Sequence, residues 1–123
     1  MITEKLTEVL GKEGVVSIVS CADGEAHVCN TWNSYLVVQE GMRILIPAYA
    51  MRKTEKNTLK NPTVQMTLGS KEVMGYNSMG TGFHLTGTAR FISEGPVWQM
   101  MKGKFSFLTR VLEVSLTAVK QTL

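Results

Sequence analysis

At 123 residues the chain is long enough for one domain with its own buried core, and 44% apolar against 19% charged residues excludes a disordered or fibrous protein. Two cysteines exclude a disulfide-stapled scaffold, and acidic residues near the N-terminus interrupt the apolar core that a signal peptide needs, so a cytoplasmic protein is expected. A net charge of +3 suits a phosphorylated small molecule, whereas scattered basic residues and short apolar runs argue against nucleic acid and membrane as partners.

Hydrophobic periodicity predicts a mainly β chain. Ile2, Leu6 and Val9 recur at helical spacing and predict a short first helix that ends near Gly11 or Gly14. Runs of β-branched or alternating residues predict six strands, the second of which is too long and too mixed to run straight and is expected to bend or bulge. The predicted strands are residues 15–20, 26–38, 42–46, 64–68, 83–91 and 112–117.

Turn and helix signals separate these strands. Pro47 is expected to end the third strand, and residues 51–61 predict a helix with Thr54 as its N-cap. A further helix is expected to begin at Gly95-Pro96 and to extend to Leu108. The glycine-rich residues 75–82 lack the lysine of a phosphate loop and run into a strand, so they are predicted to be a hairpin loop.

Six strands at hairpin-like spacing with two or three short helices predict a mostly antiparallel barrel in one domain, residues 1–123. Catalytic side chains are scarce in this pattern. His27 and Cys29 share a strand face, and Cys21 could lie nearby, but a fourth ligand for a metal is missing. No serine, histidine and aspartate set is indicated either, so redox chemistry would require a bound cofactor.

A basic cluster lies where the third strand passes into the helix. It is the run Arg52-Lys53-Thr54-Glu55-Lys56, and a helix start there would expose unpaired amides and the positive end of the helix dipole. Lys53 adds a charge and Thr54 a hydroxyl, and both suit a phosphomonoester. A capped surface helix with solvated lysines explains the same residues equally well.

Two large aromatic side chains lie among amide and hydroxyl groups in residues 30–35. Trp32 and Tyr35 lie among Asn30, Thr31 and Ser34, surroundings that suit the faces and the polar edge of a flavin ring. Alternatively, the two aromatic residues belong to the hydrophobic core, with their polar atoms hydrogen-bonded.

The chain resembles the small dimeric FMN-binding proteins, a short branch of the pyridoxamine-phosphate-oxidase-like split barrels. The matching segments occur in order over nearly the whole chain. They are Gly14-Val15-Val16, residues 30–36, Pro47, Met51, Lys53-Thr54-Glu55 with Asn57, residues 66–70, residues 80–83 and Gln121-Thr122-Leu123.

This resemblance implies a six-stranded antiparallel split barrel with Greek-key character that binds FMN as a homodimer. In the implied site Lys53 and Thr54 hold the phosphate, and Ser70 lies near the phosphate or the ribityl chain. The remaining implied contacts lie against the isoalloxazine ring or beside the expected position of the flavin. They are Asn30, Thr31, Trp32, Tyr35, Pro47, Tyr49, Ala50, Met51 and, from the partner subunit, Leu123. Two positions depart from the relatives, which carry glycines at the positions of Tyr49 and Ala50 and can carry tryptophan in place of Phe107.

Three functions follow from these observations. The first is an electron carrier that exchanges electrons with a redox partner protein or a small reductant. The second is an enzyme, either a flavin reductase or an FMN-dependent oxidoreductase acting on a small substrate. Oxidation of pyridoxamine phosphate itself is not expected, because the chain lacks the extra segment whose arginine and histidine hold that substrate in larger relatives. The third is a binding module without redox activity.

Overall fold

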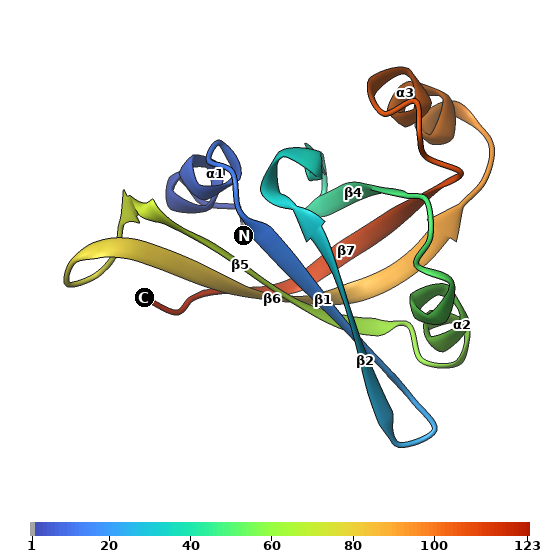
Figure 1. Ribbon diagram of the computed structural model, residues 1–123, viewed down its shortest axis with the longest axis horizontal. Coiled ribbons are helices and arrows are strands. Elements are labelled where there is room, and N and C mark those ends of the chain that lie inside the picture. The colour runs from blue at the N-terminus through green and yellow to red at the C-terminus, as the bar shows by residue number, and fades with distance from the viewer. Residues whose placement is uncertain (1) are drawn as a thin grey trace.

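The computed structural model describes residues 2–123 and has a mainly β architecture with short helices at both ends (Figure 1). The expectation of a mainly β, antiparallel fold is confirmed, with seven strands in place of six. In chain order the elements are α1 Glu4–Leu10, β1 Val15–Ala22, β2 Glu25–Trp32, the 3-10 helix η1 Asn33–Tyr35, β3 Val37–Gln39, β4 Arg43–Ala48, α2 Arg52–Lys60, β5 Thr63–Met74, β6 Met79–Ile92, α3 Pro96–Lys104 and β7 Arg110–Gln121.

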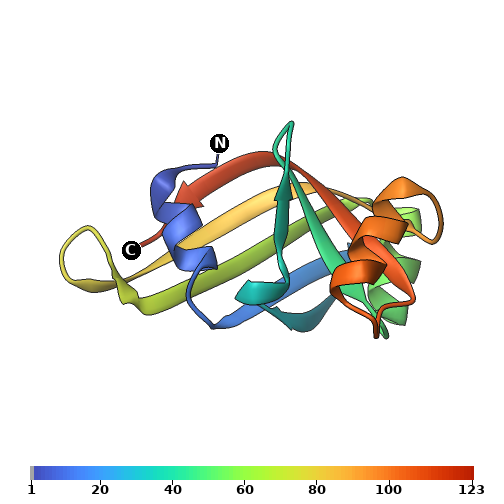
Figure 2. The ribbon, with the colours of Figure 1, turned by 90° about the horizontal axis from the view of Figure 1, so that it is seen from above.

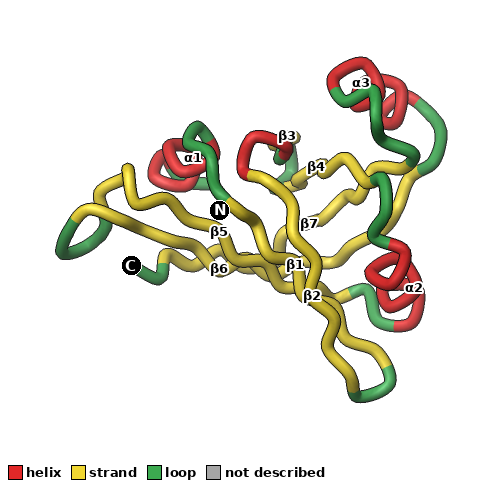
Figure 3. Tube along the Cα trace, viewed as in Figure 1, coloured by secondary structure: helices red, strands yellow, loops and turns green. Residues whose placement is uncertain are grey.

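All seven strands form one sheet in the order β2-β1-β5-β6-β7-β4-β3. The chain passes from one edge of this sheet to the other through η1, since Trp32 ends β2 and Val37 begins β3. Five residues of chain span at most about 18 Å, so the sheet must curl until its two edges approach each other at η1. Away from η1 the β1–β2 hairpin diverges from β4, which leaves the curled sheet open along that side (Figure 3).

The additional strand arises from the predicted bend in residues 26–38. Asn33 ends β2 because its side chain turns inward, where it is fully buried, and its amide group donates hydrogen bonds to three backbone carbonyls. Asparagine favours such local breaks, since its side chain competes with the strand ladder for backbone partners. The chain beyond the break pairs with β4 over three residues only, which is too short to produce an alternating pattern.

The main core fills the concave side of the sheet. Every second side chain of β1, β5 and β6 points to this side. Among these side chains, those of Ile18, Met66 and Leu85 are fully buried. Helix α1 closes one end of the curl with Leu6 and Val9. A second, smaller core lies on the convex side, where α3 covers β4 and β7 through Leu45, Met101, Leu108 and Val111.

The helices divide between the two ends of the sheet. The β5–β6 turn and the C-terminus lie at the α1 end, whereas α2 and α3 lie at the opposite end (Figure 2). Within residues 2–123 no helix combines the length and the hydropathy of a membrane span.

Several predicted boundaries are wrong. Pro47 does not end β4 but pairs with Val111 inside it, and this is tolerated because β3 accompanies β4 only as far as Leu45. Thr54 is not an N-cap, because α2 begins at Arg52 and Met51 occupies the cap position without a side-chain hydrogen bond.

Two further boundaries shift for local reasons. Helix α3 ends at Lys104, and Leu108 reaches the small core from the loop that follows. The predicted loop of residues 75–82 shortens to residues 75–78, because residues 79–82 pair with β5 and extend the hairpin. Glycines at 80 and 82 concealed this pairing in the sequence.

Candidate functional site

The start of α2 forms a positively charged corner. Met51 adopts a left-handed conformation with φ 58° and ψ 30°, which turns the chain abruptly from β4 into the helix. The first helical hydrogen bond joins the Glu55 amide to the Met51 carbonyl at 2.9 Å, so the amides of residues 52–54 precede the regular ladder. Arg52 and Lys53 are exposed beside them. An anion therefore meets backbone donors, the helix dipole and the Lys53 ammonium here, while Arg52 is paired with Glu55 at 3.3 Å.

Thr54 joins this corner to β2. Its side chain is fully buried, and its Oγ1 lies 3.3 Å from the Cys29 Sγ. Burial raises the pKa of the Cys29 thiol, and the hydrogen bond with Thr54 opposes this in part. The thiol is therefore protonated at neutral pH.

The three residues after Cys29 carry the predicted contacts to a ring. Asn30 and Trp32 point to the convex face of the sheet, where the Ser17 hydroxyl donates to the Asn30 Oδ1 at 3.1 Å, whereas Thr31 is buried on the concave face. Trp32 is 46% exposed, so the alternative that it is a core aromatic is wrong. A hollow of about 200 Å³ lies against Val15 and residues 30–32.

Tyr35 belongs to an aromatic cluster that bridges η1 and the loop after α3. Its ring centre is 5.3 Å from that of Phe105 and 5.5 Å from that of Phe107. Both pairs are tilted, an arrangement that aromatic rings favour. Tyr35 therefore packs against two rings in the manner expected of a structural aromatic, although it is only partly buried.

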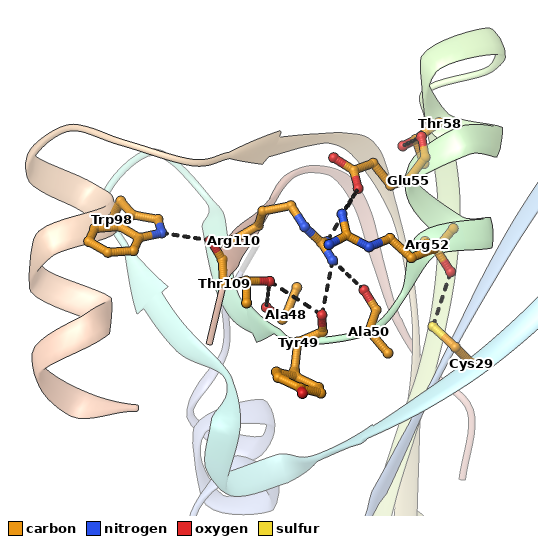
Figure 4. Close-up of polar contacts among 11 residues, drawn as sticks. Cys29, Ala48, Tyr49, Ala50, Arg52, Glu55, Thr58, Trp98, Thr109 and Arg110 are labelled. Carbon is orange, nitrogen blue, oxygen red and sulfur yellow. Dashed lines mark hydrogen bonds and ion pairs between the residues drawn. The ribbon is translucent and has the colours of Figure 1, made fainter. Parts of the chain in front are cut away.

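Residues 47–51, which lead from the end of β4 into α2, contain four of the predicted contacts, and a buried arginine anchors them (Figure 4). Pro47 is buried in β4, whereas Tyr49 is 66% exposed and Ala50 is also exposed. The Arg110 Nη2 donates to the carbonyl of Tyr49 at 3.1 Å and to that of Ala50 at 2.5 Å. These two hydrogen bonds fix the backbone immediately before Met51.

Sequence reasoning missed Arg110. It is 6% exposed, and its Nη1 lies 3.4 Å from the Glu55 Oε1, while its guanidinium stacks on the Phe91 ring at 5.3 Å. Burial lowers the pKa of Arg110, Glu55 opposes that shift, and Arg52 adds to it. The alternating pattern of β7 could have revealed this residue, because Arg110 lies two positions before Leu112 and therefore faces the core as well. The predicted strand began only at residue 112 and did not include Arg110.

Ser70 and Leu123 lie at the other end of the sheet. Both line a cavity of about 570 Å³ beside the β5–β6 turn, and the Tyr76 amide donates to the Leu123 carbonyl at 2.8 Å. Ser70 is seven residues along β5 from Thr63, the strand's first residue after α2, which amounts to about 23 Å of strand. One chain therefore does not bring Ser70 or Leu123 to the α2 corner.

The α2 corner suits a phosphorylated ligand, because it offers backbone amides and the ammonium of Lys53, donors that a phosphomonoester requires. The hollow against Trp32 lies on the convex face of β2, where it offers an aromatic face and the Asn30 amide for a ring system. Across residues 2–123, no group of three histidine, cysteine, aspartate or glutamate side chains could hold a metal ion. The donor set therefore fits FMN.

Comparisons with known proteins agree with this chemistry. The sequence model described as pyridoxamine 5'-phosphate oxidase matches residues 2–123. A protein named FMN-binding protein from Nitratidesulfovibrio vulgaris, strain Miyazaki F, is 42% identical over 116 residues, which are 94% of each chain.

Two solved structures show the same fold at low sequence identity. HupZ from Group A Streptococcus has a TM-score of 0.79 at 14% identity and covers 98% of this chain and 94% of its own. A protein named as FMN-binding from Syntrophomonas wolfei has a TM-score of 0.76 at 12% identity, with 98% and 85% covered. At these identities the likeness extends to the fold alone.

Proposed function

The chain belongs to the pyridoxamine 5'-phosphate oxidase family, and on that premise we propose that it binds FMN non-covalently and carries electrons through it. The relative with 42% identity bears the name FMN-binding protein, which supports FMN as the ligand. The observation that carries the proposal is the α2 corner, where the amides of the first helical turn lie beside the exposed Lys53. The free cysteines and the composition support the cytoplasm as its compartment.

Each group of residues in the proposed site has a separate role. Lys53 and the amides of residues 52–54 bind the phosphate, whereas Asn30 and Trp32 contact the ring. Thr54 acts through its backbone amide, because its hydroxyl already faces Cys29. The flavin supplies the ability to accept and release electrons, and the protein supplies binding and orientation.

A titration tests the phosphate seat. FMN and riboflavin, which lacks the phosphate, are each added to the purified protein and binding is followed by quenching of flavin fluorescence. Lys53→Ala removes one charge-assisted contact and is expected to weaken FMN binding by about 1.5–3 kcal/mol, or about 10- to 150-fold, with little effect on riboflavin. Lys12→Ala, an exposed lysine before β1, is the control with the same charge change. Equal FMN affinity in both variants would place the phosphate elsewhere.

A second copy of the chain is the proposed partner that completes the site. The convex face of β2, β1 and β5 exposes Val15, Val28 and Trp32 at 48%, 55% and 46%. Their neighbours in the register are uncharged, namely Ser17, Val19, Asn30, Gln65 and Thr67. An uncharged sheet face with a row of large apolar side chains is a typical subunit interface.

Dimerisation also explains the separated residues. Two copies packed through this face could bring Leu123 of one subunit to the α2 corner of the other. Val28→Lys is expected to give a monomer in sedimentation velocity and to weaken FMN binding, while Leu59→Lys, which changes an exposed residue of α2 off this face, is expected to do neither. A wild-type protein that is monomeric at micromolar concentration and binds FMN fully would refute the dimer.

Turnover separates the carrier from an enzyme. A carrier exchanges electrons with a partner protein or a small reductant but shows no saturable turnover with NADH. Saturable NADH oxidation by the FMN-loaded protein would favour the alternative, a flavin reductase or an oxidoreductase acting on a small substrate.

A further inference from the structure

Arg110 is buried in a way that stability alone does not explain. It is the first residue of β7 and lies on the concave face with the core residue Leu112, yet it carries a full charge. Its Nη2 donates to two carbonyls, but its buried Nε and Nη1 form no hydrogen bond with any of residues 2–123, and the Nη1 reaches Glu55 only as an ion pair at 3.4 Å. A buried guanidinium with incomplete hydrogen bonding is costly, so its position calls for another reason.

The first consequence of Arg110 is conformational. The carbonyls that it holds belong to Tyr49 and Ala50, the two residues directly before the left-handed Met51. With these carbonyls fixed, the backbone that leads into the turn at Met51 and the start of α2 is held in place. The guanidinium thereby sets the direction of the helix start without lying at its surface.

The second consequence is electrostatic. Glu55 is the fourth residue of α2, and its carboxylate lies close enough to the helix start to repel a phosphate. The Oε1 of Glu55 is 3.4 Å from the Nη1 of Arg110 and 3.3 Å from the Nη1 of Arg52. Two cations thus oppose one carboxylate, and the positive charge of Lys53 remains available to a ligand. The pKa of Arg110 is lowered by burial, but a guanidinium stays protonated at neutral pH.

We propose that Arg110 is a positioning residue for the phosphate: it fixes the backbone of Tyr49 and Ala50 and neutralises Glu55, so that the α2 corner accepts a dianion. This inference rests on the proposed binding of FMN. It differs from the role of Lys53, because Arg110 acts only through other groups and is 6% exposed.

The test compares FMN with riboflavin in a set of variants. Arg110→Met is expected to weaken FMN binding about tenfold to a hundredfold, the range for loss of a charge-assisted contact, and to leave riboflavin within about threefold. Glu55→Gln is expected to tighten FMN binding by a few-fold, and Arg110→Met combined with Glu55→Gln to recover the electrostatic part of the loss while the part due to the unfixed Tyr49 and Ala50 carbonyls remains. Arg43→Met is the matched control, since it also removes an arginine from a buried carboxylate, that of Glu113, which keeps Arg90.

The outcomes separate three cases. Equal weakening of FMN and riboflavin by Arg110→Met, with no recovery on adding Glu55→Gln, would overturn the proposal and leave Arg110 a merely structural residue. If Arg110→Met does not fold, Arg110→Lys and the single Glu55→Gln variant still decide, because a Glu55→Gln protein with unchanged preference for FMN over riboflavin contradicts the electrostatic part. A wild-type protein that binds neither FMN nor riboflavin refutes the proposed function itself. A wild-type protein that binds both with equal affinity shows that the α2 corner does not bind the phosphate, and this result precedes any measurement on an Arg110 variant.

Discussion

Asn33 offers the sharpest test of how the curled sheet is held together. Its buried Nδ2 donates to the carbonyls of Lys12 at 2.9 Å and of Val9 and Gly69 at 3.3 Å, so one amide joins α1, the approach to β1 and β5. Its Oδ1 is buried without a hydrogen-bond partner among residues 2–123. Replacing Asn33 by Asp keeps the shape and removes the donor.

The size of the effect follows from these contacts. Asn33→Ala loses three hydrogen bonds, two of them long, and also removes the unpaired oxygen, so a loss of about 1–3 kcal/mol in the free energy of unfolding is expected. Asn33→Asp directs a carboxylate at three carbonyl oxygens in a fully buried position, and a loss of about 3–5 kcal/mol at pH 7 is expected.

The pH dependence of stability tests whether the buried carboxylate causes the loss in Asn33→Asp. Burial without donors raises the pKa of the introduced carboxyl above its ordinary value of about 3.9. A carboxyl with a raised folded-state pKa destabilises as the pH rises through that value, because the unfolded chain ionises more readily. The deficit of Asn33→Asp should therefore shrink between pH 7 and pH 4.

Urea unfolding at pH 4, 5.5 and 7 measures this deficit against the wild type. Asn61→Asp is the control, since Asn61 is exposed and its Oδ1 already acts as an acceptor for the Thr63 amide. A deficit for Asn33→Asp that stays constant over this pH range, or one no larger than that of Asn33→Ala at pH 7, would refute the reasoning.

Three further predictions concern packing and ionisation. Gly87→Ala is expected to cost about 1–3 kcal/mol in urea unfolding, because the new Cβ would lie 2.5 Å from the Ser115 carbonyl, whereas Gly103→Ala, which meets open space in α3, should stabilise by about 0.5–1 kcal/mol. Lys60→Ala should raise the pKa of Asp23 in an NMR titration, because the hydrogen bond and charge of Lys60 are the main causes that lower it. In the wild type this lowered pKa favours the folded state above the ordinary pKa of aspartate, an effect lost as the pH falls through the lowered value. Thr54→Val should raise the pKa of the Cys29 thiol further and slow its alkylation, with Cys21 as the exposed internal reference.

Alternating side chains were sufficient to predict most of the sheet. The strands around Ile18, Met66 and Leu85 are buried on one face only, and in the sequence this appears as apolar and polar residues that alternate. A bend within residues 26–38 was predicted because that run is too long and too mixed for one straight strand, but its place after Trp32 was not. Strand β3, Val37–Gln39, could not be predicted as a separate strand, since three residues are too few to establish a period and its existence depends on β4 lying beside it.

The residues of the α2 corner could be predicted from the sequence, but the contacts that hold them in place could not. Arg52, Lys53 and the helix start could be read from adjacent residues, because they are local in the chain. The roles of Met51 and Thr54 could not, because the first depends on a backbone turn anchored by Arg110 and the second on a thiol 25 residues away. Such contacts join β2, α2 and β7, and no single segment of sequence contains both partners.

The position of Leu123 links the cofactor to the assembly. The α2 corner and the cavity that Leu123 lines lie at opposite ends of a sheet whose strands run the length of the molecule, and no rotation of side chains can join them. For both to contact one flavin, as proposed, a second chain has to bridge the distance between them, and the uncharged face around Trp32 is where that chain would lie. Trp32 would then be covered from both sides, by the ring and by the partner, which gives a physical reason for so large an aromatic side chain to remain exposed in one subunit. Affinity for FMN should accordingly depend on protein concentration, because the binding site and the dimer would form together.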